Sequence, residues 1–586
     1  MSSVWTHWTR EIAKRLSEVT GVDVSPDEIV VPPDRALGDF AWGAFRLAKV
    51  RKTSPATLAK EIAEKISVDR TDWSSVAAAG PYVNFTLIVG DAVNRVVREI
   101  ELSGTRNAER GTSEHQLVLE YAQPNTHKEI HVGHLRNLAL GLALDRILTH
   151  AGWHVVPVSY HGDVGAHVAK CLWYINKVES RKSKVESQNL APSTLHFTKD
   201  ERTGAFLGQM YAEASKELEA HPEYKDEVSV VQQKLEAHDP EWDKLWQETR
   251  RWSLDEMANI FDTLQVRIER QYLESEVVER GQQMVDELIE KGIAKESQGA
   301  IIIDLEEKKL GVFLVRKSDG TSLYATKDLA LAELKLKEYP KTSRSLILVD
   351  NRQSLYFKQL FTTLEMMNIK PVPAFIGYEF VTLKSGAMSS REGNIVTFES
   401  FFDEVMAYAR KEILSRHEDW VVGQVEHTAW AIAMGGIKFG MLKQDSDKIF
   451  TFELEQALAF DGATGPYCQY AATRLGSIIR KGGPTNPFNT EQELTALFDH
   501  ASEKALVLAL ALFPEKVAAA ADELRPAILA QWCLDTAQRV NDFYRDVSVL
   551  ESSGELREGR LRLAAAARTS LVKGLELLGI PVPEEM

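Results

Sequence analysis

The chain has 586 residues, of which 44% are hydrophobic and 26% charged, and its formal net charge is −16. At ~100–200 residues per domain, this length predicts three or four domains of an ordinary globular protein. The negative charge argues against a generic nucleic-acid binder, since neutralising phosphates needs lysine and arginine, although a local basic face could still bind RNA.

The positions of the cysteines argue against two kinds of structural site. Cys171, Cys468 and Cys533 are far apart and form no C-x-x-C pair. This argues against a zinc ribbon and against a disulfide framework, and it fits a reducing cytoplasm. No apolar segment is long enough for a signal peptide or a membrane span. We therefore expect a cytoplasmic protein that holds no metal such as zinc and has no membrane partner.

The first part of the chain, residues 1–110, predicts a small α+β domain. Apolar residues recur at helical spacing over residues 4–19, and a second helical stretch covers residues 57–66. Residues 80–88 alternate like a strand. Both a packing role and a binding role stay open, because aromatic residues at such spacing usually fill cores.

A strand, a turn and a helix are predicted next. Residues 117–121 are an apolar β-type run, Pro124 breaks the following loop, and residues 135–150 have helical periodicity. Helix starts present unpaired N–H groups to phosphate, at the edge where open α/β sheets bind ligands. His131 and His134 are three residues apart, so both rings can face this site; Gly133 lets a ligand approach, and Lys128 adds a cation. Taken alone, two such histidines also fit an ordinary helix start or a metal pair.

The rest of the pattern predicts an α/β protein. A second strand candidate at residues 155–160 makes a parallel, Rossmann-like half-sheet with the first. Residues 190–264 are helical and highly charged, which indicates a solvated helical insertion. Strand candidates at residues 300–304, 311–315 and 346–350 predict the second half of the sheet, and the chain beyond about residue 398 is helical, with an all-α bundle at its end.

Four motifs resemble one family when they are taken together. Pro124-Asn125, Lys128 and His131-Val-Gly-His-Leu-Arg-Asn137 resemble the HIGH region of class I aminoacyl-tRNA synthetases, and of arginyl-tRNA synthetases in particular. Ala387-Met-Ser-Ser-Arg-Glu-Gly-Asn394 resembles the KMSKS loop, with Ala387 and Arg391 in place of its two lysines. Leu37-Gly-Asp-Phe40 and Gly80-Pro-Tyr-Val-Asn-Phe85 are similar to the family's amino-terminal domain, and residues 461–481 to its DALR anticodon-binding domain.

This resemblance implies ATP-dependent ligation of L-arginine to tRNA(Arg) through an arginyl-adenylate, with ATP used together with Mg²⁺. It implies four regions: a tRNA-contacting domain at 1–110, a Rossmann-like catalytic domain at 111–400 with an insertion at about 190–265, a helical stem linker at 401–451, and an anticodon-binding bundle at 452–586. We expect the enzyme to be a monomer.

The resemblance also assigns residues. The ATP site would comprise Lys128, His131, Gly133, His134, Met388, Ser389, Ser390 and Arg391. Of these, Lys128 and Arg391 would jointly neutralise the β- and γ-phosphates, and the two histidines would donate hydrogen bonds to developing charge. The arginine guanidinium would be held by Glu274, Tyr324 and Asp328, and its head group by Glu120, Asn125 and Gln353. Carboxylates suit a planar guanidinium with five donors. Tyr467, Tyr470 and Arg474 would contact the tRNA.

Other interpretations stay open for each residue taken singly. Tyr324 and Asp328 also fit a solvated helix face, Glu274 an ion pair, and Tyr467 and Tyr470 a bundle core. A cysteinyl synthetase would need zinc-binding cysteines, which the sequence lacks. A tRNA-binding scaffold without activity also stays open, because Ala387 and His167 depart from the family's pattern, His167 standing where glutamine is usual.

Overall fold

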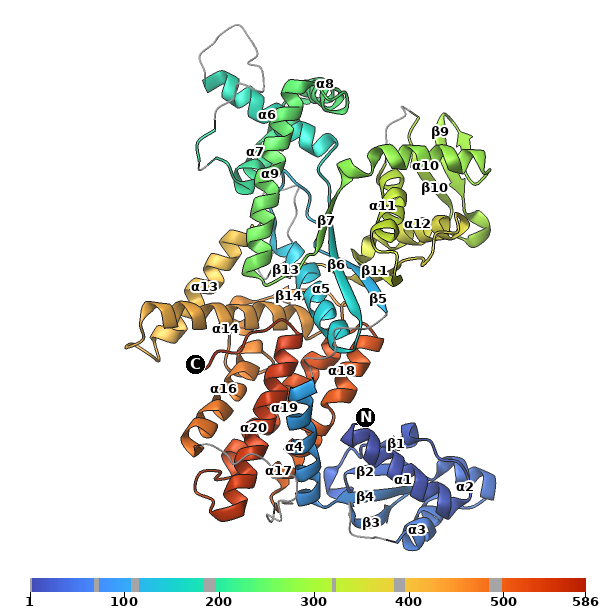
Figure 1. The fold of residues 1–586 in the computed structure, drawn as a ribbon, viewed down its shortest axis with the longest axis vertical. Coiled ribbons are helices and arrows are strands. Elements are labelled where there is room, and N and C mark those ends of the chain that lie inside the picture. The colour runs from blue at the N-terminus through green and yellow to red at the C-terminus, as the bar shows by residue number, and fades with distance from the viewer. Residues whose placement is uncertain are drawn as a thin grey trace. The chain divides into compact units, whose positions relative to one another are not determined.

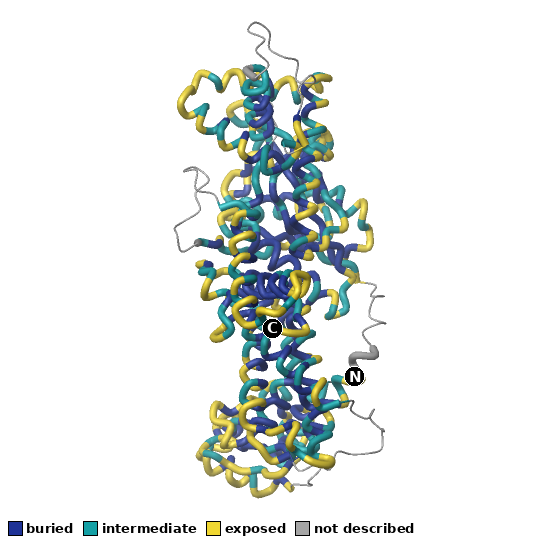
Figure 2. Tube along the Cα trace, turned by 90° about the vertical axis from the view of Figure 1, so that its left-hand side faces the viewer, coloured by how far each residue is buried: buried dark blue, intermediate teal, exposed yellow. Residues whose placement is uncertain are grey.

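The computed structural model describes residues 3–67, 73–106, 115–182, 197–199, 201–318, 323–383, 396–483 and 498–586. The chain forms two compact units. The first comprises residues 1–110, 459–523 and 527–586, and the second comprises residues 111–458 and 524–526. Both units contain buried stretches, and some helices are buried along many consecutive residues (Figure 2).

The amino-terminal part of the first unit is a four-stranded antiparallel sheet, in the order β1-β2-β4-β3, with helices packed on it. Its elements are α1 (Val4–Thr20), β1 (Ile29–Val30), β2 (Phe40–Gly43), α2 (Phe45–Arg51), α3 (Pro55–Lys65), β3 (Trp73–Ala79), β4 (Tyr82–Leu87) and α4 (Val89–Arg106). The Ser3 side chain caps α1, and Gly21 ends it in the left-handed region at φ 72°. The predicted α+β character of this part is confirmed.

The carboxy-terminal part of the first unit is a helical bundle (Figure 1). It contains α16 (Gly465–Gly482), α17 (Ala501–Ala511), α18 (Phe513–Asp522), α19 (Pro526–Asp546) and α20 (Gly554–Leu577). Asp39 connects this bundle to the sheet, because its buried carboxylate accepts a hydrogen bond from Leu87 N at 2.8 Å and lies 2.7 Å from Lys504 Nζ. Asp39 belongs to the Leu37-Gly-Asp-Phe40 motif, so that motif has a packing role within this unit.

The second unit is built on a parallel five-stranded sheet in the order β12-β11-β5-β6-β7. The strands are β5 (Gln116–Glu120), β6 (His154–His161), β7 (Arg270–Leu273), β11 (Thr342–Asp350) and β12 (Ala374–Tyr378). Long apolar strands such as 155–158 suit a sheet that is covered on both faces. The Rossmann-like fold class is confirmed.

Helices connect these strands. They are α5 (Val132–His150), α6 (Ala166–Lys182), α7 (Gly204–Ala220), α8 (Lys225–Glu236), α9 (Pro240–Thr263), α10 (Val278–Glu290), α11 (Tyr324–Glu338) and α12 (Ser354–Met366). After β12 come β13 (Val381–Leu383), α13 (Phe398–Leu414), α14 (Val422–Leu442), β14 (Phe450–Phe452) and α15 (Leu454–Ala457). Strands β13 and β14 pair in parallel.

One part of the sequence prediction is wrong. Strands at 300–304 and 311–315 were expected in the parallel sheet, but β9 (Ala300–Asp304) and β10 (Val312–Arg316) form a separate antiparallel sheet with β8 (Lys295–Ser297). Only two residues, Gln298 and Gly299, separate β8 from β9, and both have positive φ. Such a turn makes a hairpin, whereas parallel neighbours need a long crossover. This small sheet lies beside α10 and α11 (Figure 1).

The insertion, α6 to α9, differs in one respect from the predicted solvated scaffold. Its helices enclose a core of their own that includes Trp173, Trp242 and Trp252. Charged residues therefore cover only the outer faces of these helices, and the insertion is a stable body that can support a neighbouring loop.

Helix α5 packs closely on the residue that follows the first strand of the sheet. A Cβ atom added at Gly141 would lie 2.0 Å from Cδ2 of the buried Tyr121 ring. Tyr121 cannot turn away freely, because its hydroxyl donates to Arg267 O at 2.8 Å. Glycine at position 141 thus lets helix and sheet approach.

Gly141→Ala should lower the melting temperature of the protein by several degrees, since overpacking of a filled core costs about 1–3 kcal/mol. The matched control is Gly423→Ala in α14, where an added Cβ meets no atom within 4 Å. That change should leave the melting temperature equal or slightly higher, because alanine favours helix. Equal melting temperatures for both variants in a thermal scan would contradict the close packing at Gly141.

Candidate functional site

The turn between β5 and α5 holds the two histidines in a reciprocal cap. His131 is the N-cap residue, and its Nδ1 accepts a hydrogen bond from Gly133 N at 3.1 Å. His134 Nδ1 accepts from His131 N at 3.2 Å, and the ring centroids are 4.0 Å apart. The helix begins at Val132, three residues earlier than its periodicity predicts, because these caps satisfy N–H groups that the pattern of apolar residues does not report.

This cap decides the protonation of both rings. An Nδ1 that accepts a hydrogen bond carries no proton, so in each neutral ring the proton is on Nε2. Burial, followed by the neighbouring His131, lowers the pKa of His134 to about 3, and burial and Lys128 lower the pKa of His131. Both rings are therefore neutral at pH 7, and each Nε2–H can donate to a ligand.

Helix α9 of the insertion holds the loop that carries Lys128 in place. His127 has a φ of 58° and is fully buried. Its backbone N donates to Ser253 Oγ at 3.0 Å, and its Nε2 lies 2.9 Å from Thr249 Oγ1. Both partners belong to α9. A left-handed residue that is not glycine costs energy and persists only where its surroundings hold it, so α9 determines the shape of this loop.

Lys128 itself is held more loosely. Its Nζ lies 5.0 Å from the centroid of the Tyr211 ring on α7, and Lys170 lies 3.7 Å from the same centroid. The cation–π contact with Tyr211 keeps Lys128 near the two histidines, whose pKa values its charge lowers.

The second predicted ATP element lies outside the described residues. This concerns Met388, Ser389, Ser390 and Arg391, together with Ala387. The residues just after it are described and meet the histidine turn: Val132 N donates to Val396 O at 3.3 Å, and Phe398 N donates to Ile130 O at 2.8 Å. Before it, β13 contacts α5. Residues on both sides of this segment are therefore close to α5.

Arg136 of α5 links this helix to the segments that precede β13 and β14. It is fully buried, and it donates to Glu379 O at 2.8 Å, Lys448 O at 2.6 Å and Asp445 O at 3.0 Å. These carbonyl groups lie on the segments next to β13 and β14. One side chain of the histidine motif thus holds both segments against α5.

A cluster of three carboxylates lies at the carboxyl edge of the sheet. Glu120 ends β5, Glu274 follows β7, and Asp328 is on α11. Glu120 is paired with Lys335, Glu274 with Lys327, and Asp328 accepts a hydrogen bond from the Tyr356 hydroxyl. Among the described residues, no lysine forms an ion pair with Asp328, so this part of the cluster has one carboxyl group more than it has paired ammonium groups.

The surplus carboxylate has an unusual pKa. Burial, together with the charges of Glu120 and Glu274, raises the pKa of Asp328 to about 7, although the hydrogen bond from Tyr356 lowers it. The ion pair expected for Glu274 as an alternative is present, with Lys327. It does not remove the site, because the excess negative charge resides on Asp328. Such a cluster favours one incoming cation.

Of the other residues predicted to bind the substrate arginine, Asn125 and Tyr324 lie near this cluster. A Cβ atom added at Gly162 would lie 2.4 Å from Asn125 Oδ1 and 3.4 Å from Glu274 Oε1, so Gly162 brings these two side chains near each other. Tyr324 is 62% exposed at the start of α11, beside Glu274 and Asp328, whose charges raise its pKa after burial. Gln353 is exposed after β11. His167 Nε2 donates to Gly162 O at 3.2 Å, which gives this departure from the glutamine pattern a local structural role.

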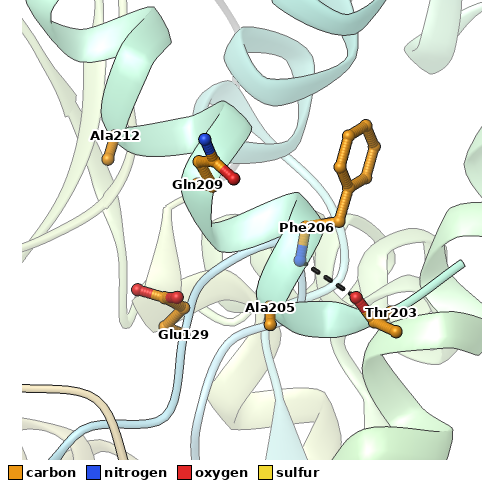
Figure 3. A pocket seen from close by; sticks show the side chains of 6 residues that line it. All are labelled: Glu129, Thr203, Ala205, Phe206, Gln209 and Ala212. Atoms are coloured by element: carbon orange, nitrogen blue, oxygen red, sulfur yellow. Dashed lines mark hydrogen bonds between the residues drawn. The ribbon is translucent and has the colours of Figure 1, made fainter. Parts of the chain in front are cut away.

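A cavity of about 510 Å³ lies beside the loop that carries Lys128 (Figure 3). It is lined by Glu129, Thr203, Ala205, Phe206, Gln209 and Ala212, from the loop and from the start of α7. None of the described residues that are predicted to bind ATP or arginine lines it. Glu129 directly follows Lys128, so this cavity borders the loop and is separate from the carboxylate cluster.

In the first unit, the predicted tRNA-contacting residues lie together on α16 against α19. Arg474 donates to Tyr470 Oη at 3.2 Å and to Asn541 Oδ1 at 3.3 Å, and its guanidinium lies 4.3 Å from the Tyr544 ring centroid. Tyr467 donates to Gln538 Oε1 at 2.9 Å. Tyr544 is 44% exposed, so this group is on a surface and is not the bundle core.

Sequence reasoning missed several residues of the site. Tyr356, Lys327 and Lys335 each bond a carboxylate of the cluster, and His127 anchors the loop. Lys327 could have been suspected from its place beside Asp328. Lys335 and Glu120 are 215 residues apart, so no local pattern reports their pairing.

The chain is similar to one family of proteins along most of its length. Residues 96–454 match the family model "tRNA synthetases class I (R), catalytic domain". The chain belongs to this family. Residues 6–87 match the arginyl tRNA synthetase N terminal domain, and residues 468–586 match the DALR anticodon binding domain.

The family assignment extends over the full chain. The chain is 36% identical to an arginine–tRNA ligase of Bdellovibrio bacteriovorus, over 95% of this chain and 94% of that protein. It is 31% identical to one of Clostridioides difficile, over 96% and 97%. The arginyl-tRNA synthetase structure of Thermus thermophilus superposes with a TM-score of 0.79 at 26% identity and covers 100% of both chains. The structure from Plasmodium falciparum has a TM-score of 0.73 at 19% identity, covers 99% of both chains, and shows the same fold.

Within the described ranges, no group of three or more histidine, cysteine, aspartate or glutamate side chains is arranged to hold a metal ion. No helix in the part of the chain that the structure describes is both long and apolar enough to cross a membrane.

Proposed function

We propose that this member of the arginyl-tRNA synthetase family ligates L-arginine to tRNA(Arg) at the carboxyl edge of its parallel sheet, with ATP as the energy source. One observation carries the assignment of the site. A helix start with two neutral histidine donors adjoins the same sheet edge as a buried carboxylate cluster that has one negative charge in excess. The first suits a polyphosphate and the second suits a guanidinium.

The residues divide between the two substrates. ATP, which enters as its Mg²⁺ complex, would lie over the start of α5, with Gly133 allowing close approach and His131 and His134 donating through Nε2–H. Lys128 would approach the β- and γ-phosphates from one side and Arg391, with Met388, Ser389 and Ser390, from the other. Asp328, Glu274 and Tyr324 would bind the guanidinium, while Glu120, Asn125 and Gln353 would orient the head group.

The reaction needs no protein nucleophile. The arginine carboxylate attacks the α-phosphorus, the bond from that phosphorus to the bridging oxygen breaks, and pyrophosphate leaves. Neutral Nε2–H groups stabilise the charge that develops on the phosphate oxygens. A terminal ribose hydroxyl of the tRNA then attacks the arginyl carbonyl, loses its proton, and displaces AMP.

The remaining assignments are part of the same proposal. Tyr467, Tyr470 and Arg474 would contact unpaired anticodon bases, and the stacking of Arg474 on two tyrosine rings supports this role. We propose a cytoplasmic monomer without zinc, which the dispersed cysteines support. The four domains would have the boundaries proposed from the sequence.

The function is tested by ATP–pyrophosphate exchange with the purified full chain, with and without tRNA, and with lysine as the control amino acid. Exchange that depends on arginine and is absent with lysine is the expected result. A folded protein without exchange under any condition, but with retained tRNA binding, would favour the alternative of a scaffold that has lost activity.

His134→Ala should lower arginine-dependent exchange by about a hundredfold or more, the usual cost of losing one preorganised donor. The matched control is His134→Gln, because glutamine at this position can still accept from the N-cap N–H and so keeps the cap. Melting temperatures and exchange rates of both variants separate the cap from the donor. An active alanine variant would remove His134 from the chemistry.

The pKa of Asp328 predicts how arginine binding depends on pH. Since this pKa is raised to about 7, the carboxyl group is partly protonated in the free protein near neutral pH. A guanidinium binds the ionised form, so the arginine KM should fall by about tenfold between about pH 6 and pH 8. The raised pKa also makes the stability of the folded protein depend on pH. Between the ordinary pKa of 3.8 and about 7 the folded state holds a proton that the unfolded chain has released, so the free energy of unfolding falls as the pH rises through this range.

The control for this prediction is Asp328→Asn. It should raise the arginine KM steeply and remove most of the pH dependence, while the ATP KM stays similar. A pH profile that is unchanged in the asparagine variant would place the titrating group elsewhere.

A further inference from the structure

The hydroxyl group of Tyr160 is buried inside the carboxylate cluster without a hydrogen-bond partner. It lies on β6, and among the described residues no side chain or backbone group forms a hydrogen bond with it. A buried hydroxyl without a partner is costly, because it has given up its hydrogen bonds to water. Other buried side-chain atoms of the described residues, such as Trp73 Nε1 and Arg136 Nε, also have no partner, but the Tyr160 hydroxyl group differs from these in lying beside three carboxylates, where a ligand with hydrogen-bond donors would complete it.

The sheet register places this hydroxyl group between the carboxylates. Val158 on β6 pairs with Glu120 on β5, and Tyr160 pairs with Tyr272 on β7, two residues before Glu274. Residues two apart on a strand, and residues paired across strands, face the same side. Val158, Tyr160 and Tyr272 contribute to one core cluster with Leu329 of α11, so that side is the face that α11 covers.

Helix α11 covers the carboxylate cluster. Lys335 reaches Glu120, Lys327 reaches Glu274, and Asp328 bonds Tyr356 on α12. Burial and then the charges of Asp328, Glu274 and Glu120 raise the pKa of Tyr160 well above its ordinary value, so its hydroxyl group keeps its proton. None of these carboxylates is its hydrogen-bond partner, although all act on it electrostatically.

We propose that Tyr160 is a further substrate-binding residue, whose hydroxyl oxygen accepts a hydrogen bond from the guanidinium of the bound arginine. This rests on the proposed function, because it places the guanidinium in the carboxylate cluster. The carboxylates supply charge, whereas the phenol oxygen supplies a neutral acceptor in a fixed direction. A guanidinium has five donors, more than one carboxylate can satisfy, and a rigid aromatic acceptor adds geometric selection.

The test is Tyr160→Phe in the full-length protein, assayed by arginine-dependent aminoacylation. The arginine KM should rise by about tenfold, as expected for a lost hydrogen bond to a charged group, with kcat changed less than the KM and the ATP KM unchanged. The melting temperature should stay equal or rise, since the hydroxyl group has no partner in the free protein.

Tyr272→Phe is the matched control. Tyr272 is the residue paired with Tyr160 on the neighbouring strand, and its hydroxyl donates to Glu338 at 2.8 Å. Its removal should lower the melting temperature and leave the arginine KM unchanged, the reverse of the result for Tyr160.

Agmatine, which has the guanidinium but no carboxylate, identifies the end of arginine that is contacted. Its inhibition constant should rise in Tyr160→Phe by the same factor as the arginine KM. An agmatine inhibition constant that does not change would move the contact to the head group and overturn the assignment.

The outcomes separate this inference from the proposed function. A wild-type protein that does not charge arginine would contradict the proposed function itself. An active wild-type protein together with an unchanged arginine KM in Tyr160→Phe, or with a clearly lower melting temperature, would overturn only the role of Tyr160.

Discussion

The structure depends on an excess of one buried negative charge at the carboxyl edge of the parallel sheet. Glu120 and Glu274 are each compensated by a lysine of α11, while burial and the charges of these two glutamates raise the pKa of Asp328 to about 7, so that its carboxyl group is only partly ionised near neutral pH. Burying an ionised group without compensation is expensive, and a protein retains such a cost where a ligand relieves it. The same helix therefore supplies the lysines that compensate Glu120 and Glu274, and it also presents Asp328, the group that makes the site attractive to a cation.

The start of α5, where we propose that ATP binds, differs from the carboxylate cluster. Backbone N–H groups and neutral histidine donors, instead of buried charges, are available there to a ligand. Both histidines use Nδ1 to cap α5, which leaves Nε2–H as the ring group that can donate to a ligand. Their lowered pKa values keep the rings neutral, so their hydrogen bonds do not depend on a proton that could be lost near pH 7. Positive charge in the described part of this region comes from Lys128, and the contacts of Arg136 bring the segments beside residues 384–395 to the same helix.

The helical insertion supports the loop that carries Lys128. Thr249 and Ser253 of α9 hold His127 in a left-handed conformation, and Tyr211 of α7 lies near Lys128. A position in the insertion can thus influence the ATP site through one loop residue. The insertion core, with its buried tryptophans, gives these contacts the rigidity that a solvated helix pair would lack.

The sequence by itself determined the elements and the family, because hydrophobic periodicity, Pro124 and the histidine motif are local signals. Strands β5 and β6, helix α5 and the order of the domains' motifs could all be predicted from it. The sequence did not place β9 and β10 outside the parallel sheet, since a strand pattern contains no record of its partner. Only the tertiary structure decided which carboxylates are compensated, because Lys335 pairs with Glu120, 215 residues away in the chain. Likewise, the register of three strands is what brings Tyr160 to the carboxylate cluster. The physical reason is that pairing, burial and the resulting pKa depend on distances between segments that are remote in the chain.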